Sequence, residues 1–145
     1  MGDIMKFNNK MELEFSAISA NEGFARVAVA SFISQINPTL AEITEVKTAV
    51  SEAVTNAIIH GYEMNSEKRV KIVCTIEDRN AEITVQDVGC GIENIELARE
   101  ALYTTKPDME RSGMGFTIME EFMDDIEVIS NVGEGTKIVM RKRFS

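Results

Sequence analysis

Two polar residues in the segment SEAVTNAIIHG, residues 51–61, have the types and the spacing of a reactive pair. Glu52 and Asn56 are four residues apart and therefore share one face of a helix, separate from the apolar stripe of the same segment. A carboxylate in this position could accept a proton from an attacking hydroxyl group. An amide oxygen is a hard ligand of the kind that Mg²⁺ prefers. The alternative, which this segment taken alone favours, is a helix face that simply contacts solvent.

A second candidate is DVGCGI, in which Asp87 ends a predicted strand and Gly89 and Gly91 follow at alternate positions. The exocyclic amine of an adenine needs a hydrogen-bond acceptor, and a carboxylate at a strand end supplies one. The two glycines would let the ring lie against the backbone. The alternative is a turn after the strand, since Asp and Gly are both common in turns. Cys90 has no chemical partner in this segment and is interpreted as a bystander.

A third candidate is RSGMGFTIMEEF, where Arg111 precedes Ser112, Gly113, Met114 and Gly115 at the start of a predicted helix. Backbone N–H groups at a helix N-terminus bind phosphate, and glycines let the phosphate approach closely. The guanidinium group of Arg111 could contact a terminal phosphate. A plain turn is the alternative, and the segment alone favours it.

Two weaker candidates flank these segments. Residues 88–112 show little periodicity, which is typical of a functional lid, and Thr105 and Lys106 lie in its TTKP stretch. Lys106 precedes Pro107, and its alternative role is that of a solvated side chain. Residues 133–136, GEGT, are interpreted as a hairpin turn in which Thr136 could add a hydroxyl group near the base.

The periodicity predicts the elements that position these residues. Helix start signals of the capping-box type occur at Ser19 with Glu22 and at Thr39 with Glu42. The predicted strands are residues 11–15, 70–77, 81–87, 125–130 and 136–143, and the predicted helices are residues 19–36, 39–60 and 114–122, with Gly61 closing the second. This order predicts an α/β (α+β) two-layer sandwich, a mainly antiparallel mixed sheet with helices on one face.

Length and charge narrow the class of protein. A chain of 145 residues predicts one domain, residues 11–145, preceded by an extension, residues 1–10, that is either disordered or foreign to the natural chain. The net charge of −9 argues against nucleic-acid binding and suits a basic protein partner. No apolar run reaches the length of a membrane span, and no export signal is visible, so the two cysteines are expected to be reduced thiols in a cytoplasm.

The order of these segments resembles the GHKL family of ATPases and kinases, with its N box, G1 box and G2 box all present. Within that family SEAVTNAIIHGY, TTKP and ERSGMGFTIMEEFMD are similar to the anti-sigma factor kinases of spore-forming bacteria. The resemblance implies a Bergerat-type ATP-binding fold that takes ATP or ADP with Mg²⁺. It implies that Glu52 is the general base, that Asn56 is the Mg²⁺ ligand, and that Asp87, Gly89 and Gly91 form the base pocket. It further implies that Gly113 and Gly115 shape the phosphate loop and that Arg111 meets the terminal phosphate.

The same resemblance implies the partners. The substrate would be a serine of an anti-anti-sigma protein, and the second partner would be a sporulation sigma factor that a kinase homodimer holds inactive. The residues implied in sigma-factor contact are Glu22 and Arg26, although the capping box already accounts for Glu22. A nucleotide-gated binding module without catalysis is the alternative. The catalytic domain of a sensor histidine kinase is disfavoured, because the sole histidine, His60, lies inside the N-box helix.

Overall fold

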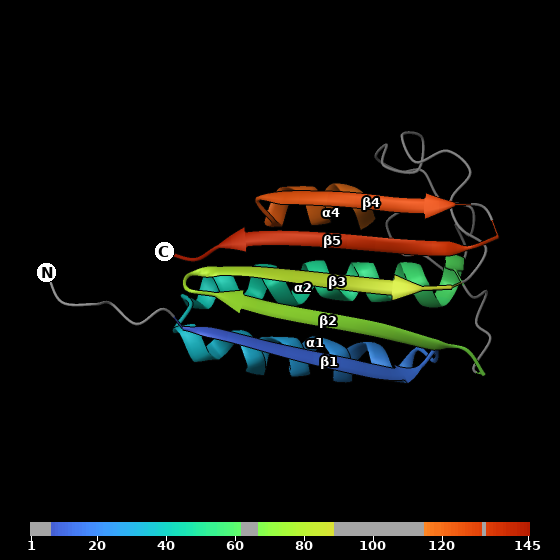
Figure 1. Ribbon diagram of the computed structural model, residues 1–145, viewed down its shortest axis with the longest axis horizontal. Coiled ribbons are helices and arrows are strands. Elements are labelled where there is room, and N and C mark those ends of the chain that lie inside the picture. Colours follow the sequence, from blue (N-terminus) through green and yellow to red (C-terminus); the bar gives the residue numbers. More distant parts are fainter. Residues whose placement is uncertain (1–6, 62–66, 89–114, 132) are drawn as a thin grey trace, which may run out of the picture.

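The computed structural model describes residues 7–61, 67–88, 115–131 and 133–145. Five strands form one sheet in the order β1-β2-β3-β5-β4, and the helices lie on one face of it (Figure 1). The elements are β1 (Asn8–Ser16), α1 (Ala20–Ile33), the 3-10 turn η1 (Ser34–Ile36), α2 (Leu40–Asn56), the π-helical turn η2 (Ala57–Gly61), β2 (Arg69–Glu77), β3 (Asn80–Asp87), α4 (Gly115–Phe122), β4 (Asp125–Asn131) and β5 (Gly135–Arg143). The predicted two-layer α+β sandwich is confirmed. All four strand pairings of the described sheet are antiparallel, so the expected mixed character is not found there.

Alternation along the strands explains why the described helices all lie on one face of the sheet. In β2 the residues Val70, Ile72, Cys74 and Ile76 are all buried, while the residues between them are partly exposed. Side chains with this period of two point to the same face, and here that face packs against the helices. The hydrophobic core therefore lies between the sheet and the helix layer.

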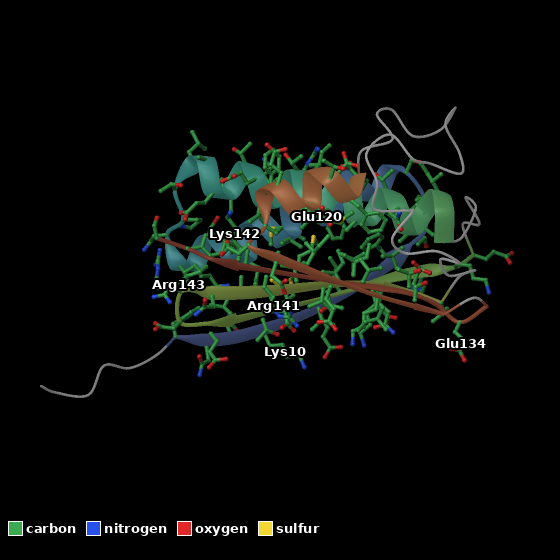
Figure 2. All side chains as sticks on the ribbon, turned by 90° about the horizontal axis from the view of Figure 1, so that it is seen from above. Lys10, Glu120, Glu134, Arg141, Lys142 and Arg143 are labelled. Atoms are coloured by element: carbon green, nitrogen blue, oxygen red, sulfur yellow. The ribbon has the colours of Figure 1, made fainter. Side chains whose placement is uncertain are left out.

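The opposite face of the sheet carries charged side chains and has no helix over it among the described residues (Figure 2). Arg141 of β5 lies on this face and pairs with three carboxylates on neighbouring strands: Glu82 at 3.0 Å, Asp125 at 2.8 Å and Glu127 at 3.3 Å. The hydrogen bonds that Arg141 donates to these carboxylates, first of all to Asp125, raise the pKa of Arg141 above its ordinary value. Exposed pairs of this kind each contribute little to the free energy of unfolding.

The two predicted capping boxes have different outcomes. At α2 the box is confirmed, because the Thr39 hydroxyl accepts from the Glu42 N–H at 3.1 Å and the Glu42 carboxylate accepts from the Thr39 N–H at 2.8 Å. At α1 the prediction is wrong, because Ser19 makes no side-chain cap and has helical backbone angles, φ −57° and ψ −31°. A capping side chain reaches back to the helix only from an extended residue. The carboxylate of Glu22 instead lies 3.6 Å from the guanidinium group of Arg26.

The strand boundaries differ slightly from those predicted. β1 begins at Asn8, which pairs with Glu77, so residues 8–10 belong to the sheet rather than to an N-terminal extension. The hairpin between β2 and β3 is tighter than expected, because Glu77 pairs directly with Asn80 and leaves a turn of two residues. Asp78, in that turn, has a left-handed φ of 59°.

α2 is the central helix of the layer. It packs against α1 on one side and α4 on the other, and η2 continues it over β3 and β5. No helix in the described part of the chain is long and apolar enough to cross a membrane.

Candidate nucleotide site

Three polar residues form a row across one end of the sheet. Asp87 of β3 is opposite Thr136 of β5, which in turn is opposite Ser130 of β4. These residues share the strand parity of Val85, Ile138 and Val128, so their side chains point toward the helix layer. Asp87 and Thr136 are each only 5% exposed. Polar groups buried this deeply at the edge of an apolar core require partners, and they are the natural contacts for a polar ligand.

Hydrogen bonds fix the orientation of this row. The backbone N–H of Thr136 donates to Oδ1 of Asp87 at 3.3 Å. The hydroxyl oxygens of Ser130 and Thr136 are 2.8 Å apart. The Ser130 hydroxyl also donates to the carbonyl oxygen of Gly135 at 3.1 Å. The Asp87 carboxylate and the Thr136 hydroxyl are therefore held side by side before any ligand binds.

Gly135 is necessary for this arrangement. Its φ is +106°, and a Cβ atom added to it would lie 2.3 Å from the carbonyl oxygen of Asp87 and 2.5 Å from the Cα of Val88. Only glycine allows the start of β5 to lie so close to the end of β3. The predicted turn at residues 133–136 is confirmed between β4 and β5, but this close contact was missed. A GEGT sequence by itself does not reveal which backbone it will pack against.

Glu52 and Asn56 lie on the side of α2 that faces α4 and β5. Glu45 marks that side, because its carboxylate is 3.8 Å from the ammonium group of Lys142 on β5. Lys142 also donates to the carbonyl oxygen of Phe122 at the end of α4, at 2.7 Å. Glu52 and Asn56 follow Glu45 by two and three turns of the helix on the same side. Both are partly buried.

The far end of α2 approaches the polar row. η2 follows directly after Asn56 and packs against β3 and β5, the strands that carry Asp87 and Thr136. Figure 1 shows this end of α2 beside the arrowhead of β3. A single π-helical turn is rare and frequently accompanies a functional site. The regular helix predicted through residue 60 is thus replaced by a wider turn after Asn56.

The described residues contain no group of three or more His, Cys, Asp and Glu residues that could hold a metal ion. Mg²⁺ usually keeps several waters and is bound by few protein oxygens together with substrate phosphates. A single amide oxygen from Asn56 fits that kind of site.

Many of the predicted site residues lie outside the described residues. They are Gly89, Gly91, Thr105, Lys106, Arg111, Ser112, Gly113 and Met114. Gly115, the last residue of the predicted phosphate-binding segment, is described by the structure. It is the buried first residue of α4. Of the predicted nucleotide-site residues, the structure therefore describes Glu52, Asn56, Asp87, Gly115 and Thr136.

Glu22 and Arg26, the predicted partner-binding residues, lie on α1. Their ion pair is partly buried. On the same helix Phe24 and Val27 are 54% and 58% exposed, although both are apolar. α1 therefore presents apolar as well as charged side chains to solvent.

A hollow of about 590 Å³ opens at the other end of the sheet. Figure 2 places Arg141, Lys142 and Arg143, three of its lining residues, far from Glu134 in the β4–β5 turn. The remaining lining residues are Thr75, Glu77, Asn80, Ala81, Glu82 and Asp124. None of the predicted site residues is among them.

Comparison with known proteins extends these observations. The model of the histidine kinase-like ATPase domain matches residues 15–142. The anti-sigma F factor of Clostridium acetobutylicum is 65% identical over 137 residues, which are 94% of this chain and 95% of that protein. The anti-sigma F factor of Clostridium perfringens is 61% identical over 138 residues, 95% of this chain and 99% of that protein. That of Bacillus subtilis is 60% identical over 137 residues, 94% of each chain.

The fold is shared with solved structures. The RsbU and RsbW domains of a Mycobacterium tuberculosis protein match with a TM-score of 0.68 and 17% identity, covering 94% of this chain and 32% of that one. At this identity the match concerns the fold alone.

Proposed function

Because the chain belongs to the histidine kinase-like ATPase domain family, and within it to the anti-sigma F factors, we propose that it is an ATP-dependent protein serine kinase. It binds and inhibits a sigma factor of sporulation and phosphorylates a serine of the matching anti-anti-sigma protein. The names of the relatives support the binding of a sigma factor, and the ATPase-like family supports the kinase activity.

The observation that carries the kinase proposal is the buried Asp87–Thr136 pair beside the end of the helix that holds Glu52 and Asn56. The Asp87 carboxylate accepts a hydrogen bond from the exocyclic amine of adenine. Gly89 and Gly91 would contact the ring, and the residues proposed to contact the phosphates are Thr105, Lys106, Arg111, Ser112, Gly113, Met114 and Gly115.

Phosphoryl transfer depends mainly on positioning and on stabilisation of charge. The hydroxyl oxygen of the substrate serine forms a bond to the γ-phosphorus of ATP, and Glu52 accepts the proton of that hydroxyl group. The bond between the γ-phosphorus and the bridging oxygen breaks, and ADP leaves with that oxygen. Asn56 would hold Mg²⁺, which when bound would offset the charge of the phosphates. Arg111 contacts the transferred phosphoryl group.

The partners follow from the surface and from the family. Arg26, beside the exposed Phe24 and Val27, is the principal sigma-factor contact, and Glu22 orients it through their ion pair. The chain acts as a homodimer in the cytoplasm, where sigma factors work. Its net charge of −9 favours protein partners over direct contact with nucleic acid.

Transfer of radiolabelled phosphate tests the catalytic part. The wild-type protein, incubated with γ-labelled ATP, Mg²⁺ and an anti-anti-sigma protein, should label that protein, and Glu52→Ala should abolish labelling while ATP still binds. Glu121→Ala, which removes an exposed carboxylate from α4, is the matched control and should retain transfer. Absence of labelling in the wild type would leave the nucleotide-gated binding module as the function.

Binding measurements test the partner part. Arg26→Ala should weaken sigma-factor binding at least tenfold, since charged contacts at a buried interface centre carry much of the affinity. Lys47→Ala, on α2, is the control. Light scattering of the free protein determines whether it is a homodimer. Undiminished sigma-factor binding by Arg26→Ala would exclude the proposed contact surface.

A further inference from the structure

We propose that Ser130 is a positioning residue that fixes the direction of the Thr136 hydroxyl and thereby makes the site selective for 6-aminopurines over 6-oxopurines. This inference rests on the proposed nucleotide binding beside Asp87. It concerns a residue on β4, an edge strand that none of the sequence motifs includes.

The Ser130 hydroxyl group has a single proton to donate. Its oxygen lies 3.1 Å from the carbonyl oxygen of Gly135 and 2.8 Å from the hydroxyl oxygen of Thr136. A carbonyl can only accept, so Ser130 is the donor in the first contact. The second contact is then satisfied only if Thr136 donates its proton to Ser130.

The acceptor of the Ser130 proton is itself held in place. Gly135 packs its Cα against the backbone of Asp87 and Val88, in a space where no Cβ atom fits. It also pairs with Asn131 at the end of β4. The carbonyl that receives the Ser130 proton is therefore part of the rigid strand junction.

The direction of this hydrogen bond determines which ligand groups Thr136 can bind. With its proton engaged by Ser130, the Thr136 oxygen has only lone pairs left for a ligand. Asp87, its neighbour in the row, contributes a carboxylate, which also accepts. A ligand group that contacts both residues must therefore be a donor. The exocyclic amine of adenine is such a group, whereas the 6-carbonyl of hypoxanthine or guanine would place oxygen against oxygen.

Hydrogen bonding separates 6-aminopurines from 6-oxopurines more strongly than the shape of the pocket can. A buried polar group that faces the wrong purine loses its hydrogen bond to water and gains none in return. Loss of Ser130 would release the Thr136 proton. Thr136 could then turn its hydroxyl and donate to a 6-carbonyl. Selectivity should fall although neither Thr136 nor Asp87 has changed.

The test is to titrate ATP and inosine triphosphate, each with Mg²⁺, into the wild type and into Ser130→Ala, Ser130→Thr and Thr136→Val by calorimetry. We expect Ser130→Ala to lower the ratio of ATP affinity to inosine triphosphate affinity by about three- to tenfold, the worth of one net hydrogen bond. Ser130→Thr keeps the hydroxyl and should restore the ratio. The double variant Ser130→Ala/Thr136→Val should show the same ratio as Thr136→Val alone, because Ser130 acts only through Thr136.

Circular dichroism of each variant and Ser31→Ala, an exposed serine of α1, serve as controls. If Ser130→Ala weakens both nucleotides equally, Ser130 is merely structural and the inference is wrong. The same holds if its effect on the ratio persists without the Thr136 hydroxyl. If the folded wild type binds neither nucleotide, the proposed function itself fails, which is a distinct result.

Discussion

The substitution Gly135→Ala should uncouple β5 from β3 at the nucleotide site. The new methyl group would lie 2.3 Å from the carbonyl oxygen of Asp87 and 2.5 Å from the Cα of Val88. Both are backbone atoms, so neither can move aside without moving its strand. A side chain at φ +106° adds a conformational cost of about 1–2 kcal/mol. Overpacking against a fixed neighbour costs about 1–3 kcal/mol more. The expected loss of unfolding free energy is therefore about 2–5 kcal/mol.

Gly133→Ala separates these two contributions. Gly133 also has a positive φ, +81°, but an added Cβ would meet no atom within 4 Å. The Gly133→Ala variant should lose only the conformational contribution to the unfolding free energy, about 1–2 kcal/mol. Urea denaturation followed by circular dichroism gives both free energies, with unchanged slopes as the check on two-state behaviour. Gly135→Ala should in addition bind ATP more weakly, because the Thr136 N–H separates from Asp87. Equal stability of the two alanine variants would refute the close-contact argument.

Three further outcomes are expected. Asp87→Asn should bind ATP at least about tenfold more weakly by calorimetry, since it removes a charged acceptor, and undiminished binding would exclude the adenine contact. The hydrogen bond from the backbone N–H of Thr39 lowers the pKa of Glu42 from its ordinary value of 4.5. The ionised Glu42 carboxylate therefore stabilises the folded protein fully above pH 4.5, and this stabilisation is lost as the pH falls through the lower pKa of the folded state. The stability gap between wild type and Glu42→Gln, less than about 1 kcal/mol at pH 7, should thus close in acid, and a gap independent of pH would contradict this. Burial raises the pKa of Cys74 to about 12, so in a Cys90→Ser background Cys74 should react with a thiol reagent only as fast as the protein unfolds; faster labelling would show an exposed thiol.

The strands and helices could be predicted because their signals are local. Alternation such as that of Val70, Ile72 and Cys74 requires one buried face whatever lies opposite. Thr39 with Glu42 forms its capping box because Pro38 and the left-handed Asn37 place Thr39 in an extended conformation.

The errors arose where the outcome depends on contacts between distant residues. Ser19 has the same sequence signature as Thr39, but the backbone before it differs. There, Ile18 and Asn21 both hydrogen-bond to the carbonyl oxygen of Ser16, which makes a turn that continues directly into the helix. The contact of Gly135 with Asp87 depends on β5 lying between β3 and β4, an order that no local pattern specifies. For the same reason the hydrogen bond between Ser130 and Thr136 was not foreseen.

The π-helical turn at Ala57–Gly61 bears on how this protein tolerates changes in length. A wide turn holds an additional residue compared with an ordinary helix of the same rise. Deletion of one residue from the π-helical turn would let this segment become regular α-helix while Ile58 or Ile59 stays in the apolar interior. A deletion of one residue within this turn should thus be absorbed locally and leave α2, Leu40–Asn56, in its place in the helix layer.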